Sequence, residues 1–338
     1  MRKALIIGID NYAGHELTGC VADARAIAQV LQTNGNDERN FDVKLITGPV
    51  PGADGKIAPP PADQTVDELS PPGGVSRALL KKEIDALFAD DSDIALFYFS
   101  GHGAMTNVGG VILTSDFQSY DEGVMMNEIL AYANKSKAKD KIVMLDCCHS
   151  GAFGTPREDG TNVAELSEGM TVLTAARDIQ VAMEKGGHGI FTSLVLDALN
   201  GGAADLRGHI TPGSIYAYVD QALGSWDQRP IFKTNVTRTT VVRSLPPAIP
   251  ILMFKKLTEY FPAADAEFKL DPYFEFSNPS ADPAKVAMFK ILQKFYGVDL
   301  IEPVGEEHMY YAAINSKSCR LTPAGRQYWR LVKEKRIP

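Results

Sequence analysis

Short apolar runs and stretches with apolar residues at helical spacing alternate through the first 244 residues of the chain. The apolar, β-branched runs predict buried strands at 4–9, 41–47, 94–99, 141–145 and 171–175, with an edge strand at 230–236 and a short strand or hairpin arm at 111–114. The helical spacing predicts helices at 21–33, 75–89 with Ser76 as N-cap, 127–134, 191–199 and 214–223. This alternation favours a mostly parallel sheet covered by helices on both faces, which is an α/β fold.

The end of this pattern marks a domain boundary. Residues 245–250 are proline-rich and read as a linker, so we expect one domain at 1–244 and a second at 251–338. The second segment predicts helices at about 251–261 and 284–296, a β-hairpin at 300–321 and a final helix from Pro323. This order, with the phrase Leu-Thr-Pro-Ala-Gly-Arg at 321–326, resembles a winged-helix domain. Residues 49–74 are rich in Pro and Gly and predict a mobile surface insertion.

Composition narrows the class of protein. The chain has 338 residues, 45% hydrophobic and 22% charged, as in ordinary globular proteins. Its net charge is −8, so nucleic acid is not an expected partner, and residues 245–338 carry only two more basic than acidic side chains. The sequence shows neither a secretion signal nor about 20 consecutive apolar residues that would span a bilayer. With 4 cysteines, two of them adjacent, we expect reduced thiols and a cytoplasmic protein.

Two predicted strand ends present reactive side chains between small residues. The strand at 94–99 ends in Ser-Gly-His-Gly, which contains His102, and the strand at 141–145 leads through Asp146 and Cys147 to Cys148 in Cys-His-Ser-Gly. A cysteine attacks as thiolate, and an imidazole that takes its proton activates it. The carboxyl ends of parallel strands share one edge of a sheet, so the sequence predicts a Cys148–His102 dyad.

Other interpretations of these residues remain. Each of the two alone is also compatible with a buried structural cysteine or a satisfied core histidine. By strand alternation Cys147 points to the opposite face from its neighbours and belongs to the core. A zinc site of Cys147, Cys148, His149 and His102 is the weaker hypothesis, because adjacent cysteines place two thiolates on one ion poorly.

These two motifs make the chain similar to a known family. Residues 98–103 (Tyr-Phe-Ser-Gly-His-Gly) and 146–151 (Asp-Cys-Cys-His-Ser-Gly) resemble the histidine and cysteine motifs of the caspase-fold clan, in particular metacaspases and their bacterial relatives, the C14 cysteine peptidases. The resemblance covers about 1–244 and includes 8–12, 17–24, 173–176 and 189–192. It implies a three-layer αβα sandwich with a mostly parallel six-stranded sheet, a large part at 1–151, a processing loop at about 152–168 and a small part at 169–244.

The resemblance also implies the roles of individual residues. His102 would be the general base and Cys148 the nucleophile, and the Gly103 and Cys148 backbone N–H groups would hold the oxyanion. The pocket for the residue before the cleaved bond would be Cys20, Asp23, Ser100 and Asp146. Two carboxylates there favour Arg, then Lys. The chain lacks the Gln-Ala-Cys sequence of animal caspases, and an Asp substrate would meet like charge.

Two further expectations concern activation. Self-processing is common in this clan, and Arg157 in the polar loop is the candidate cleavage site, although a solvated loop arginine is the plain alternative. Many metacaspases bind calcium. Here Asp116 fits one ligand position, but the positions expected for other ligands hold Met126, Asn127 and Thr155. Because calcium needs several oxygen ligands that include carboxylates, we expect no cofactor and no calcium requirement.

The motifs and the resemblance together favour a regulated cysteine endopeptidase of prokaryotic type that acts on proteins with exposed Arg or Lys, and whose C-terminal segment recruits an unidentified protein partner or controls activation. A role in defence or cell-death signalling is what the resemblance to the family implies. The alternative is a catalytically quiet caspase-like adaptor whose C-terminal domain binds protein or DNA. Within the peptidase class, legumain-like or aspartate-directed cleavage is the second possibility.

Overall fold

The chain forms two compact units in a computed structural model that describes residues 1–107, 109–118, 121–147, 166–175, 184–185, 188–223 and 229–337. Unit 1 comprises Met1–Ala204 and His209–Leu245, and unit 2 comprises Asp205–Gly208 and Pro246–Pro338. Among the helices of the described residues, none combines the length and apolar character that crossing a bilayer requires.

Unit 1 is built on a central sheet that, within the described residues, has seven strands in the order β13-β9-β8-β4-β1-β2-β3. These are β1 (Arg2–Ile9), β2 (Asp42–Gly48), β3 (Glu68–Leu69), β4 (Ile94–Ser100), β8 (Asp140–Asp146), β9 (Met170–Thr174) and β13 (Ile231–Asn235). All pairs are parallel except that β13 runs antiparallel to β9. The α/β fold with a mostly parallel sheet is thus confirmed, as is the edge position of β13.

The expected count of six strands is wrong by one short strand. The two residues of β3 pair with Leu45 and Ile46 of β2, and Glu68 forms a bidentate ion pair with Arg25, at 2.8 Å for each contact. This part of the segment 49–74 is therefore anchored on the sheet, although the whole segment was expected to be mobile. A strand of two residues is too short to produce an alternating pattern in the sequence.

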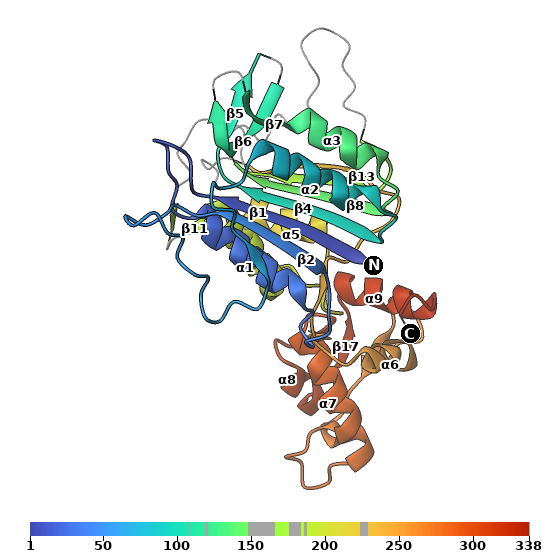
Figure 1. Ribbon diagram of the computed structural model, residues 1–338. Helices are drawn as coiled ribbons and strands as arrows, with labels where there is room; N and C mark the ends of the chain where they lie inside the picture. The colour runs from blue at the N-terminus through green and yellow to red at the C-terminus, as the bar shows by residue number, and fades with distance from the viewer. Residues whose placement is uncertain are drawn as a thin grey trace. The chain divides into compact units, whose positions relative to one another are not determined.

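Helices cover both faces of the sheet, which makes three layers (Figure 1). The unit 1 helices are α1 (Cys20–Gln32), α2 (Arg77–Ala89), α3 (Met126–Lys135), α4 (Ile190–Asp197) with the π-helical turn η2 (Ala198–Gly202), and α5 (Pro212–Ala222). Helices α2 and α3 pack with one set of alternate strand residues, including Phe97 and Val143, and with Cys147 just after β8. Helices α1, α4 and α5 pack with the other set, including Tyr98 and Met144. Strand alternation thus sends each side chain to one of two cores.

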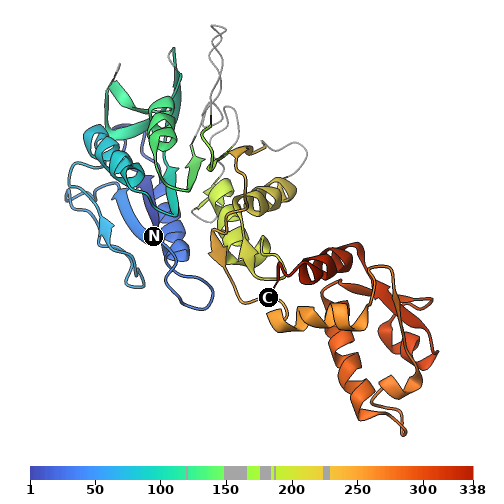
Figure 2. The same cartoon turned by 90° about the vertical axis from the view of Figure 1, so that its right-hand side faces the viewer.

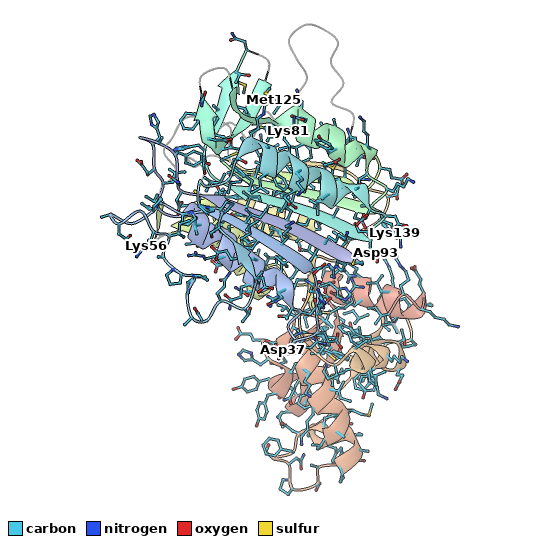
Figure 3. The ribbon with its side chains drawn as sticks, in the orientation of Figure 1. Asp37, Lys56, Lys81, Asp93, Met125 and Lys139 are labelled. Carbon is cyan, nitrogen blue, oxygen red and sulfur yellow. The ribbon has the colours of Figure 1, made fainter. Side chains whose placement is uncertain are left out.

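Unit 1 also contains small antiparallel sheets and a cluster of ion pairs. The sheets are β5 (Gly103–Thr106), β6 (Gly109–Gln118) and β7 (Asp121–Met125), then β10 (Glu184–Lys185) with β11 (His188–Gly189), and β12 (His209–Ile210) with β14 (Arg243–Ser244). At the amino end of the central sheet the Asp93 carboxylate binds Lys139 at 2.6 Å and the N-terminal amine at 2.7 Å (Figure 3). These ion pairs lie at the opposite end of the strands from Ser100 and Asp146.

Unit 2 combines helices with one antiparallel sheet (Figure 2). Its elements are the 3₁₀ turn η3 (Ile251–Phe254), α6 (Lys255–Tyr260), β15 (Glu267–Lys269), the 3₁₀ turn η4 (Pro272–Phe274), α7 (Pro283–Gly297), β16 (Ile301–Val304), α8 (Met309–Ile314), β17 (Ser318–Leu321) and α9 (Pro323–Lys333). The sheet order is β15-β17-β16, and its core includes Phe254, Phe295 and Trp329.

The expected helix–helix–hairpin–helix order of unit 2 is wrong in two respects. Strands β16 and β17 do pair antiparallel, but helix α8 joins them, so residues 300–321 are not a simple hairpin. A third strand, β15, pairs with β17. The resemblance to a winged-helix domain therefore does not describe the observed order of elements. The final helix does begin at Pro323, where the Thr322 side chain accepts a hydrogen bond from the Gly325 N–H at 2.9 Å.

Candidate active site

The carboxyl ends of β4 and β8 lie in register at one edge of the sheet. Ser100, the last residue of β4, is paired with Asp146, the last residue of β8, and the Gly101 N–H donates to the Asp146 carbonyl at 3.3 Å. His102 therefore leaves β4 directly beside the end of β8. The sequence prediction that these two strand ends are neighbours is correct.

The imidazole of His102 is held by a backbone group. Its Nε2 lies 2.8 Å from the carbonyl oxygen of His15, in the loop that follows β1. A carbonyl oxygen only accepts hydrogen bonds, so Nε2 carries the proton and, in a neutral ring, Nδ1 is left as the basic nitrogen. The contact thus selects the tautomer in which Nδ1 can take up a proton.

Tyr12 fixes the backbone of His102. Its ring is fully buried, with the two ring centroids 4.7 Å apart, and its hydroxyl accepts from the His102 N–H at 3.0 Å. A side chain at Gly101 would bring a Cβ to 2.4 Å from this hydroxyl oxygen, so the close approach requires glycine there. Burial raises the pKa of Tyr12 well above its ordinary value, which keeps the hydroxyl protonated.

Three elements bring the four predicted pocket residues together in what we call the acidic cluster: Cys20 and Asp23 of α1, Ser100 of β4 and Asp146 of β8. The Ser100 hydroxyl lies 3.4 Å from Asp23 Oδ2 and also hydrogen-bonds the Cys20 thiol. Asp23 and Ser100 are each 2% exposed, whereas Asp146 is partly exposed.

Burial and neighbouring carboxylates keep Cys20 from being a nucleophile. Burial raises the pKa of its thiol strongly, and Asp10, Asp146 and Asp23 raise it further. A thiol that stays protonated is a poor nucleophile. Cys20 therefore acts as a neutral part of the acidic cluster. Asp10 holds the start of α1, because its Oδ1 accepts from the Cys20 N–H at 2.8 Å.

The carboxylate of Asp146 accepts two hydrogen bonds from Thr192, the third residue of α4. The Thr192 hydroxyl donates to Asp146 Oδ2 at 2.6 Å, and the Thr192 N–H donates to the same carboxylate. Burial nevertheless raises the pKa of Asp146, since these two hydrogen bonds only partly offset the loss of water. Among the ion pairs of the described residues, none includes Asp146.

Gly189, at the end of β11 and just before α4, lies against both carboxylates. Strand β11 packs on α1 (Figure 1), and the Gly189 N–H donates to Asp23 Oδ2 at 3.2 Å. A Cβ at this position would lie 2.9 Å from Asp146 Oδ2 and 3.3 Å from Asp23 Oδ2. The two carboxylates therefore converge on the position that a Cβ of residue 189 would occupy, and glycine, which has no Cβ, keeps this space free.

Other predicted residues have different outcomes. Gly103 begins β5 directly after His102, and Cys147 is buried in the core beneath α2 and α3. Cys148, His149 and Arg157 lie outside the described residues. Asp116 accepts from the Arg77 N–H and the Thr114 hydroxyl, and the described residues contain no cluster of three metal-binding side chains. Sequence reasoning did not find the roles of Tyr12, the His15 carbonyl, Gly189 and Thr192.

Most of unit 1 matches a known protein family. The profile of the family described as Caspase domain matches residues 1–241. Caspase-1 from Spodoptera frugiperda has a similar structure at 15% identity and a TM-score of 0.48, covering 72% of this chain and 90% of the other. Protein GSU0716 from Geobacter sulfurreducens has 17% identity and a TM-score of 0.46, covering 70% and 94%. A comparison with curated proteins gave no match.

Proposed function

The chain belongs to the caspase-domain family, and we propose that it is a cysteine endopeptidase that cleaves proteins after Arg and, less well, after Lys. Cys148 is the nucleophile and His102 the general base. The backbone N–H groups of Gly103 and Cys148 stabilise the oxyanion.

The observation that carries this proposal is the register of β4 and β8. Ser100 and Asp146 are paired, and His102 and Cys148 each follow two residues later in the sequence. The His15 carbonyl supports the role of His102, because it directs the proton to Nε2 and leaves Nδ1 to accept the thiol proton. A base that is itself oriented by a third group is the arrangement that activates a nucleophile.

The acidic cluster supports cleavage after a basic residue. Asp23 and Asp146 converge near Gly189, and the other two members of the acidic cluster, Cys20 and Ser100, carry no positive charge. A guanidinium entering there would meet two carboxylates and could bind in a bidentate manner, whereas an Asp side chain would be repelled. The substrates expected are therefore proteins with exposed Arg or Lys.

The proposal is tested with three fluorogenic peptides that differ only in Arg, Lys or Asp before the cleaved bond. We expect cleavage in the order Arg, Lys, with none after Asp, and loss of all cleavage in Cys148→Ala and His102→Ala. Folding of both variants is checked by thermal unfolding. A wild-type protein that cleaves none of the peptides, or a Cys148→Ala protein as active as wild type, would contradict the proposal.

We further propose that the activity needs no calcium. Asp116 accepts hydrogen bonds from Arg77 and Thr114, and the positions expected for the other calcium ligands hold Met126, Asn127 and Thr155, none of which has a carboxylate. The expected result is full cleavage of the Arg peptide in a chelator. Loss of activity in the chelator and recovery on adding calcium would overturn this.

Self-processing after Arg157 is part of the same proposal, because this arginine matches the proposed specificity. Mass spectrometry of purified wild-type protein should show a break after Arg157 that is missing in Cys148→Ala. A Cys148→Ala protein that is still cut there when incubated alone would exclude self-processing.

A further inference from the structure

We propose that Thr192 is the positioning residue that fixes the Asp146 carboxylate for a planar guanidinium, and that it thereby sets the preference for Arg over Lys. The inference rests on the proposed function. It assigns to Thr192, on helix α4, the orientation of the Asp146 carboxylate, and it does not make Thr192 a residue that contacts the substrate.

The hydrogen bonds around Thr192 form a chain with one direction. The Thr192 side chain is fully buried, its hydroxyl donates to Asp146 Oδ2 at 2.6 Å, and the Tyr98 hydroxyl lies 2.5 Å from the same Thr192 oxygen. A threonine hydroxyl has one proton. With that proton directed to the carboxylate, Tyr98 must donate to Thr192. Both hydroxyl groups are thus committed, and the carboxylate cannot rotate without breaking the chain.

Thr192 binds the Asp146 carboxylate of β8 because it lies in the first turn of helix α4. The first N–H groups of a helix have no partner within the helix and need acceptors. Gly189, the residue before α4, has no side chain to supply one. Asp23 instead accepts the Gly189 N–H, and Asp146 accepts both the N–H and the hydroxyl of Thr192. The two acids therefore cap α4 from outside and are held in place by it.

A fixed carboxylate matters more for Arg than for Lys. A guanidinium is planar and forms two parallel hydrogen bonds with a carboxylate only when the two planes match. An ammonium is a compact charge with rotatable donors and tolerates a rotated carboxylate. Releasing Asp146 from Thr192 should consequently weaken the recognition of Arg more than that of Lys.

The experiment compares cleavage of matched Arg and Lys peptides by wild type, Thr192→Val, Thr192→Ser and the control Thr171→Val. Thr171 is also buried, and its hydroxyl hydrogen-bonds that of Thr234. It lies near the amino end of β9, whereas Asp146 lies at the carboxyl end of β8. We expect Thr192→Val to lower kcat/KM for the Arg peptide about 10- to 100-fold, mainly through KM, and the Lys value by less. Thr192→Ser should restore the ratio, and Thr171→Val should keep it.

A folded Thr192→Val protein with the wild-type Arg-to-Lys ratio would overturn the inference and leave the proposed function intact. Wild type that cleaves neither peptide would overturn the proposed function, and this inference with it. If Thr192→Val does not fold, Tyr98→Phe decides the matter: it removes only the outer donor of the chain, so a smaller fall in the same ratio supports the inference and an unchanged ratio contradicts it.

Discussion

Replacing Asp146 by Asn should weaken cleavage after Arg and at the same time stabilise the protein. The substitution keeps the shape and an acceptor for Thr192 but removes the charge. Loss of one partner from a buried, hydrogen-bonded charge pair costs about 2–5 kcal/mol. Asp146 is partly exposed, so the lower half of this range applies. At about 1.4 kcal/mol for each tenfold change, kcat/KM for an Arg peptide should fall about 30- to 300-fold.

The gain in stability follows from the raised pKa of Asp146, which burial causes. An acid with a higher pKa in the folded state holds its proton more tightly there, so the folded wild type loses stability as pH rises from the unfolded value of about 3.9 to the raised value. Asparagine does not titrate. The unfolding free energy of Asp146→Asn should therefore equal that of wild type below about pH 4. Its excess over wild type should grow as pH rises to the raised pKa of Asp146 and stay constant at higher pH.

Thermal unfolding between pH 3 and pH 8 and cleavage of the Arg peptide measure the two effects. Asp140→Asn is the matched control: Asp140 begins the same strand, is buried, and pairs with Arg238 at 3.3 Å. That variant should leave the cleavage rate unchanged and should not raise the Tm. A lowered Tm for Asp146→Asn at pH 7, or an unchanged kcat/KM in a folded variant, would refute the reasoning.

Three further substitutions test other parts of the architecture. Gly189→Ala places a methyl group against both acids of the proposed pocket and should lower kcat/KM for the Arg peptide about tenfold. It should also lower Tm, because the Asp146 carboxylate cannot move away without straining its hydrogen bonds to Thr192. Unchanged activity would contradict the geometry. Tyr12→Phe leaves the His102 N–H without its acceptor and should cost about 1–3 kcal/mol of unfolding free energy, measured in urea. Asp93→Asn should lower Tm slightly at pH 7, but not near pH 2. Lys139 and the N-terminal amine hold the pKa of the Asp93 carboxyl at about 2. The stability that this carboxylate contributes is therefore lost as pH falls through that value.

The strand ends were predictable because buried parallel strands are continuous apolar runs and end where polar residues begin. The runs that end at Phe99 and Leu145 located Ser100 and Asp146 correctly, and alternation placed Cys147 in the core. The arrival of Asp23 from α1 came from resemblance to a family rather than from spacing. Periodicity within one helix does not specify which strand it packs against.

The contributions of α4 and of the backbone could not be predicted in the same way. Thr192 is one of three polar residues in the otherwise apolar helix α4, and nothing in the sequence distinguishes it from the adjacent Ser193. The His15 contact uses a carbonyl that any residue would supply. Helix α8 was missed for another reason. Its buried residues Met309, Ala312 and Ala313 have helical spacing, but six residues are too few to separate this from alternation.

Asp146 has a structural role at the end of β8 that is compatible with its proposed role as a pocket acid. Its carboxylate caps α4 through Thr192, yet an ionised carboxylate offers about four acceptor positions, so two donors leave capacity for a substrate cation. The two hydrogen bonds from Thr192 lower the free-energy cost of burying the Asp146 charge but do not cancel it, because the pKa of Asp146 stays raised. A guanidinium bound in the proposed pocket would offset the rest of this cost. On this argument the helix cap prepares the acid for its proposed substrate, and fold and specificity depend on the same hydrogen bonds.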